Sequence, residues 1–150
     1  MDKQNAVYKI YPNAQFNPAC FEFSESEARQ KKLWRDPRPM PTQKELEAAM
    51  VLAGKESAIE QAYMGMVRDV YNEMEKVFGT RNDVSAQATA STYEAMEKRP
   101  SNYVGMLGLN DEAAVVAYAV TKINEADTYA VFRLSRIAQF QAERTAIINQ

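Results

Sequence analysis

The chain has 150 residues, of which 46% are hydrophobic and 25% are charged, and its formal net charge is −2. This length is typical of one domain, and the balanced charge argues against a general polyanion binder, which is normally basic. The sequence contains no histidine and one cysteine, Cys20. These counts exclude Ser-His-Asp and Cys-His catalysis, histidine-ligated metal sites and an internal disulfide. We therefore expect no catalytic residues, no metal and no cofactor.

We expect neither a signal peptide nor a membrane-spanning segment. The N-terminus, MDKQNAVYKIYP, lacks the apolar stretch of a signal peptide. The longest apolar run, AAVVAYAV at Ala113–Val120, is far shorter than the ~20 residues that span a bilayer. We expect a cytoplasmic or virion protein that is not secreted by a signal peptide and has no membrane partner.

Residues 1–41 hold five of the six prolines and form an N-terminal arm. Two segments of this arm, AVYKIY (6–11) and ACFEF (19–23), are aromatic or β-branched, which favours extended structure. They are interpreted either as a short β-hairpin or as two extended segments laid on another element. Ser24-x-x-Glu27 is a capping-box pattern and predicts a short helix over 25–35, which ends before Asp36-Pro37.

Residues 42–150 carry the spacing of a helical bundle. Thr42-x-x-Glu45 is a second capping box, and it begins a long amphipathic helix that ends at about Phe78, with a kink or break expected near Gly54. A shorter helix is predicted over 85–98. A last helix, capped by Asn110 or Asp111, is predicted to reach about Ile148, with a weak point at 124–128. The predicted fold is all-α: a single domain consisting of a helical bundle with two long helices and the N-terminal arm.

The last helix carries apolar residues on two faces, whereas an ordinary surface helix has one apolar stripe. One face holds Val116, Val120, Ile123, Ala130, Leu134 and Ile137. The other holds Val115, Tyr118, Tyr129, Phe132 and Phe140. Either the helix is central in its own bundle, or its second face meets another chain. On the second interpretation, Tyr118, Tyr129, Phe132 and Phe140 are candidate partner-binding residues.

The stretch RQKKLWRDPRPMP, residues 29–41, combines the only tryptophan, Trp34, with five cations: Arg29, Lys31, Lys32, Arg35 and Arg38. In nucleic-acid binding, the cations would contact phosphates and Trp34 would stack on a base. In a structural or partner-docking arm, Trp34 would be a buried anchor with the cations around it. A plain connector is the third interpretation.

Three classes of function remain open. The first is a non-enzymatic helical structural or scaffold subunit of a larger assembly or homo-oligomer, such as a structural component of a virus or phage. The second is a small regulatory protein that binds a protein partner or nucleic acid. The third is a Mg²⁺-dependent nucleotide hydrolase that would use carboxylates four residues apart, such as Glu56 and Glu60.

Overall fold

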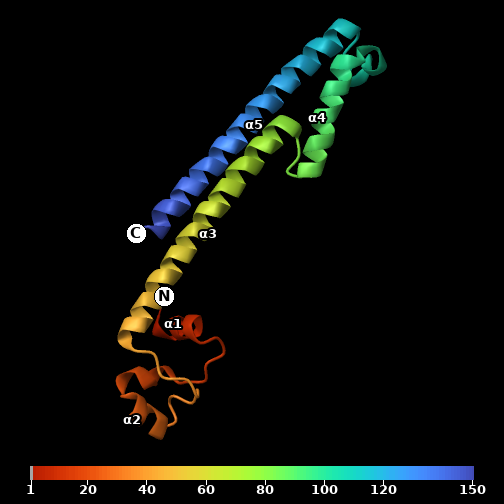
Figure 1. The fold of residues 1–150 in the computed structure, drawn as a ribbon. Coiled ribbons are helices and arrows are strands. Elements are labelled where there is room, and N and C mark those ends of the chain that lie inside the picture. The colour runs from red at the N-terminus through yellow and green to blue at the C-terminus, as the bar shows by residue number, and fades with distance from the viewer. Residues whose placement is uncertain (1) are drawn as a thin grey trace. The chain divides into compact units, whose positions relative to one another are not determined.

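The computed structural model describes residues 2–150 and is all-α, as predicted, with no strand among those residues. Two helices are long, which confirms the predicted architecture (Figure 1). The helices are α1 (Lys3–Ile10), α2 (Glu25–Gln30), α3 (Gln43–Phe78), α4 (Asp83–Lys98) and α5 (Glu112–Ile148). Short 3-10 helices lie between them: η1 (Pro18–Glu22), η2 (Pro100–Tyr103) and η3 (Met106–Gly108).

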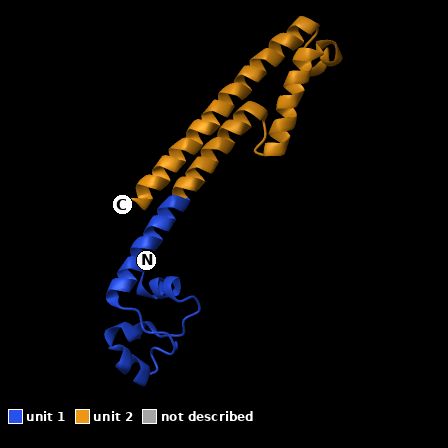
Figure 2. Ribbon diagram, in the orientation of Figure 1, with its two compact units in different colours: residues 1–60 blue, residues 61–150 orange. Residues whose placement is uncertain are grey.

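The chain forms two compact units, residues 1–60 and residues 61–150 (Figure 2). The boundary falls within α3. The sequence pattern changes earlier, after residue 41, where the proline-rich stretch ends. The first turns of α3 nevertheless belong to unit 1, because Leu46 is buried in the same core as Trp34.

The predicted β-hairpin does not form. AVYKI is helical and belongs to α1, in which the Asp2 side chain accepts a hydrogen bond from the Asn5 N–H at 2.9 Å. ACFE lies in η1, and β-type pairing in residues 2–150 is limited to one isolated bridge between Phe16 and Trp34. The hairpin prediction was wrong because β propensity depends strongly on context. Here an N-cap and the burial of Ala6 and Val7 on one helix face stabilise α1 instead.

Helix α2 is shorter than predicted. It begins after Ser24, whose side chain accepts from the Glu27 N–H at 3.3 Å, but it ends at Gln30 rather than at residue 35. Lys32 has a φ of 56°, in the left-handed region, and the N–H groups of Lys32 and Leu33 donate back to the carbonyls of Arg29 and Ala28. This is a Schellman motif. The left-handed position in such a motif is usually glycine. Because Lys32 occupies it here, the end of the helix could not be predicted from the residue type.

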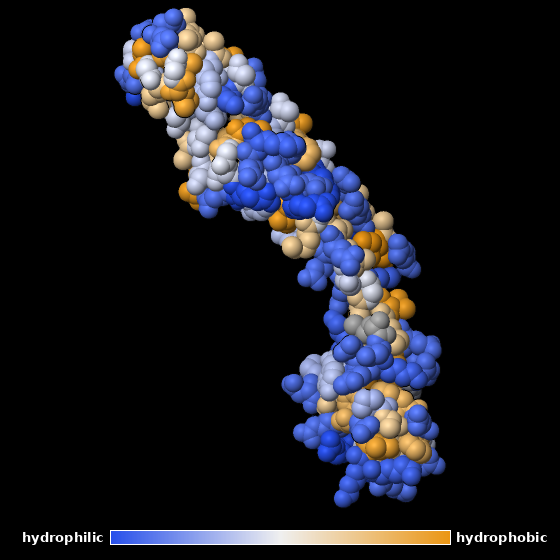
Figure 3. All heavy atoms as spheres, turned by 180° about the vertical axis from the view of Figure 1, so that it is seen from behind, coloured by the Kyte–Doolittle hydropathy of each residue, from blue (hydrophilic) through white to orange (hydrophobic). Residues whose placement is uncertain are grey.

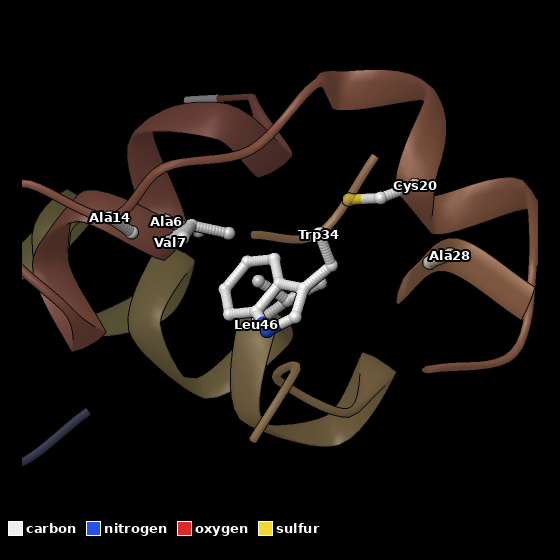
Figure 4. Close-up of a cluster of buried hydrophobic side chains, with 7 residues drawn as sticks. All are labelled: Ala6, Val7, Ala14, Cys20, Ala28, Trp34 and Leu46. Atoms are coloured by element: carbon white, nitrogen blue, oxygen red, sulfur yellow. The ribbon is translucent and has the colours of Figure 1, made fainter. Parts of the chain in front are cut away.

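Unit 1 is organised around the indole of Trp34, which is 1% exposed (Figure 4). The ring packs against Phe16 and Tyr11, with ring centroids 5.7 and 6.4 Å away. Its Nε1 donates to the carbonyl of Arg38 at 2.9 Å, so the one polar atom of the ring has a partner. The other fully or nearly fully buried side chains of this core are Ala6, Val7, Ala14, Cys20, Ala28 and Leu46.

Unit 2 consists of residues 61–78 of α3 together with α4 and α5. Helix α5 is antiparallel to the other two: Tyr63 of α3 meets Phe140, Phe78 of α3 meets Tyr129, and Tyr93 of α4 meets Tyr118. In Figure 1, α4 lies beside the first half of α5. Helices α3, α4 and α5 meet near Tyr129, which packs with Val70, Met74 and Ala86.

From residue 42 onward, the helices begin and end close to the predicted positions. Thr42 and Glu45 exchange the hydrogen bonds of a capping box, and Gly79 follows α3 with a φ of 68°. Asp111 caps α5 by accepting from the Ala114 N–H at 2.7 Å. Helix α3 continues through Gly54, and α5 continues through 124–128, so neither helix is broken into two at these points. Within residues 2–150, no helix has both the length and the apolarity to cross a membrane.

Candidate interaction surface

Arg29, the first cation of the 29–41 stretch, forms contacts within unit 1. Its Nη1 and Nη2 donate to the carbonyls of Asp36 and Arg38 at 2.8 and 2.9 Å, and its Nε and Nη2 donate to Glu25. The bond from Arg29 lowers the pKa of Glu25. Arg29 therefore links the 36–38 loop to α2, and its charge is used in contacts within unit 1.

Arg38 and Asp36 form a second internal pair. Asp36 is 4% exposed and accepts from the Arg38 backbone N–H, Nε and Nη2 at 2.9, 2.7 and 2.7 Å. The hydrogen bonds from the Arg38 side chain lower the pKa of Asp36 to about 2. The same guanidinium lies over the ring of Tyr11, at 4.4 Å from the centroid. Asp36 is thus ionised and satisfied at neutral pH beside the Trp34 core.

The other three cations of the stretch point to the surface. Lys31 lies over the ring of Phe23 at 5.0 Å, and Lys32 and Arg35 are exposed. The helix predicted over 25–35 would have included Lys31, Lys32 and Arg35, but α2 ends before all three. Trp34 lies inside the core of unit 1, so in this conformation its ring is not accessible for stacking on a base.

The aromatic face of α5 contacts the other helices of unit 2. Tyr129 is 8% exposed and makes an edge contact with Phe78, at 5.4 Å between centroids. Phe132 packs on the same cluster, whereas Tyr118 and Phe140 contact Tyr93 and Tyr63. The structure therefore uses the four predicted partner-binding aromatics of this helix as internal contacts.

Two ion pairs support these helix contacts. Arg136 of α5 donates from Nε to Asp69 of α3 at 3.1 Å, and this bond lowers the pKa of Asp69. Arg133 of α5 lies 3.5 Å from Asp83 of α4. The arginines of α5 near residue 135 therefore join α5 to both neighbouring helices.

The opposite side of α5 is uncovered, and we call it the outer face. Its residues are all exposed and follow alternating steps of four and three: Ala113, Ala117, Val120, Asn124, Asp127, Val131, Leu134, Ala138 and Gln141. Val131 and Leu134 are 69% and 70% exposed. Asp127 is the only charged residue of the face. The solvent side of a surface helix normally carries many charges, so this face has the composition of a packing surface.

A groove of about 550 Å³ lies between α3 and α5, beside the outer face. Val77, Tyr129 and Phe132 give it apolar walls, and Glu73 and Glu125 add two carboxylates. Thr121, Asn124 and Thr128 complete its lining. Because Asn124 belongs to both the groove and the outer face, the two form one continuous surface of unit 2.

The connection between α4 and α5 adds exposed apolar side chains that were not predicted from the sequence. Val104, Met106 and Leu107 are 42%, 47% and 69% exposed. Leu107 has a φ of 51°, a left-handed conformation that is unfavourable for a leucine. The signal available in the sequence was the density of large apolar residues in YVGMLGL. Exposed apolar side chains are visible as orange patches on the face drawn in Figure 3.

The remaining candidate groups are Glu56, Glu60 and Cys20, of which Glu60 is exposed. Glu56, one of the two proposed metal-binding carboxylates, forms an ion pair with Lys9 within unit 1. Among residues 2–150, no three histidine, cysteine or acidic side chains gather as a metal-binding group. Cys20 is fully buried, and burial raises the pKa of its thiol.

A scan of protein-family models, a search of curated proteins and a search of solved structures each return no match to this chain.

Proposed function

We propose that this chain is a helical structural or scaffold subunit of a larger assembly, and that it acts through protein–protein contacts. The observation that supports this proposal most directly is the outer face of α5, which is exposed and carries one charge along its length. An apolar strip on a water-facing helix lowers solubility unless another surface covers it.

The outer face of α5 differs from the exposed side of residues 68–78 of α3. Those exposed positions hold Arg68, Asn72, Glu75 and Lys76, whereas Tyr63 and Met64, the large apolar residues of α3 that are exposed within unit 2, lie before them. Val120, Val131 and Leu134 occupy exposed positions of α5. The contrast supports a contact surface on α5 in particular.

The nucleic-acid alternative draws less support from the structure. Arg29 and Arg38 are both held by carboxylates and backbone carbonyls of unit 1. Lys31, Lys32 and Arg35 remain as exposed cations of the stretch, and three charges contact only a short length of a phosphate backbone.

The proposal is tested in the cells that naturally produce the chain. Leu134→Cys places a thiol on the outer face, and Val84→Cys places one at a 74% exposed position of α4. In a lysate we expect the chain to sediment well ahead of a monomer, with a maleimide labelling Val84→Cys faster than Leu134→Cys. Native Cys20 is buried and contributes little background. Monomeric sedimentation with equal labelling of the two thiols would contradict the proposed function.

A further inference from the structure

The outer face of α5 has the periodicity of a coiled-coil seam. Its residues alternate steps of four and three, the spacing that keeps one side of a helix facing a partner helix. The inward side of α5 already contacts α3 and α4, so the seam is additional to the bundle of unit 2. A further helix of matching spacing is the element that such a surface accommodates.

We propose that this helix is α5 of a second copy of the chain, packed antiparallel, with the twofold axis midway between Val131 and Leu134. The inference rests on the proposed function and names its partner. In this register Val131 of one copy faces Leu134 of the other, and Asn124 faces Gln141. The two apolar residues with the greatest exposure on the face thus cover one another, and the two amides meet as a polar pair.

The position of Asp127 supports this orientation and register. Around the proposed axis, Asp127 faces Ala138 of the second copy, and the two Asp127 side chains lie about 16 Å apart along the helices, at 1.5 Å per residue. A parallel pair would place Asp127 directly against its counterpart, which is unfavourable in a seam. Moving the axis by one heptad, to between Asn124 and Asp127, would also bring the two carboxylates close together.

The size of the face is sufficient for a dimer. In the proposed register, residues 117–148 of the two α5 helices overlap, which is about 46 Å at 1.5 Å per residue, and a helix with its side chains is about 10 Å across. Two copies would therefore bury on the order of 1,000 Å², which is near the lower limit for a specific interface. Thr121, Thr128 and Ser135, all exposed and uncharged beside the seam, would form its rim.

Cysteine pairing tests the partner and the register together. Full-length Asn124→Cys and Gln141→Cys are purified separately, mixed and oxidised. We expect a disulfide-linked dimer from the mixture and little from either variant alone, because two copies of residue 124 would lie about 25 Å apart along the axis. Asn124→Cys mixed with Ser91→Cys, an exposed position on α4, is the matched control and should not cross-link.

Light scattering of the purified chain gives the second readout. We expect twice the monomer mass, and we expect Leu134→Lys to be monomeric with unchanged helical circular dichroism. Efficient cross-linking of Asn124→Cys with itself would overturn the antiparallel register. A monomeric native chain would overturn self-association, and if that chain still sedimented as a large complex in its own lysate, the proposed function would stand with a different partner.

Discussion

Units 1 and 2 use charged side chains in opposite ways. In unit 1, the cation-rich stretch folds back on itself, and Arg29 and Arg38 satisfy a buried carboxylate and two carbonyls around Trp34. In unit 2, the ion pairs of Arg133 and Arg136 lie at the helix contacts, and the outer face of α5 is left almost without charge. The cluster of charge in the sequence is therefore used within the fold of unit 1, whereas the scarcity of charge on an exposed side of α5 is the basis of the proposed contact surface.

The largest effect is expected at the centre of unit 1. Trp34→Ala removes the ring that touches Phe16 and Tyr11, and loss of such a core side chain costs about 3–5 kcal/mol. Since a unit of this size is marginally stable, we expect it to unfold. Hydrogen exchange read by peptide should show lost protection in unit 1 and retained protection in α4 and α5. Val84→Ala, at an exposed site, is the control, and full protection of unit 1 in Trp34→Ala would contradict its central role.

Tyr129 is the corresponding test in unit 2. Its ring is buried between the helices, but its hydroxyl has no hydrogen-bond partner. We expect Tyr129→Ala to lower the free energy of unfolding of unit 2 by about 3–5 kcal/mol. Tyr129→Phe should change it by less than about 1 kcal/mol, since no bond is lost. Urea denaturation followed by circular dichroism measures both, and equal losses in the two variants would show that the hydroxyl matters.

A comparison of Arg38 and Arg35 distinguishes a cation that stabilises unit 1 from one that is only solvated. Arg38→Gln removes the ion pair of buried Asp36 and should lower the urea midpoint of unit 1. Arg35→Gln changes an exposed side chain and should leave the midpoint unchanged. Trp34 fluorescence reports on this unit alone, because the chain has one tryptophan. Equal midpoints for the two variants would remove the distinction between the cations.

Acid should weaken unit 1 through Asp36. Its pKa is about 2 in the folded chain, below its ordinary value of 3.8, so the folded state binds fewer protons than the unfolded state. The stabilisation is complete above about pH 4 and is lost as the pH falls towards 2. Asp36→Asn should remove this part of the acid dependence in unfolding curves read by Trp34 fluorescence. An unchanged acid profile in that variant would assign the dependence to other carboxyls.

The smallest effect is expected at the apolar loop before α5. Leu107 is exposed and left-handed, and glycine adopts that conformation without the strain of a side chain. Leu107→Gly should therefore raise the free energy of unfolding of unit 2 by up to about 1 kcal/mol. Thermal unfolding of this variant, compared with Met106→Gly as the control, gives the measurement. A loss of stability would mean that the leucine packs within the unit.

Local signals in the sequence determined most of the helices. Thr42-x-x-Glu45, Gly79 and Asp111 are local signals, and each begins or ends a helix through backbone conformation or hydrogen bonds within a few residues. Helical spacing likewise predicted the two long helices. These features depend on residues that are close together in the chain, so they can be predicted from the sequence alone. Of the first apolar face predicted for α5, Val120 and Leu134 are exposed, whereas Ile123 packs against the core of unit 2.

Only the tertiary structure decided which surfaces are inside. α1 is helical because Ala6 and Val7 are buried there, and α2 ends early because the chain turns to bury Trp34; neither contact has a local sequence signal. For α5, periodicity showed two apolar faces, but the aromatic one faces inward because α3 and α4 supply Phe78, Tyr63 and Tyr93 as partners. Which face meets its own chain is set by residues far apart in the sequence, and this long-range pairing left Val131 and Leu134 on the outside.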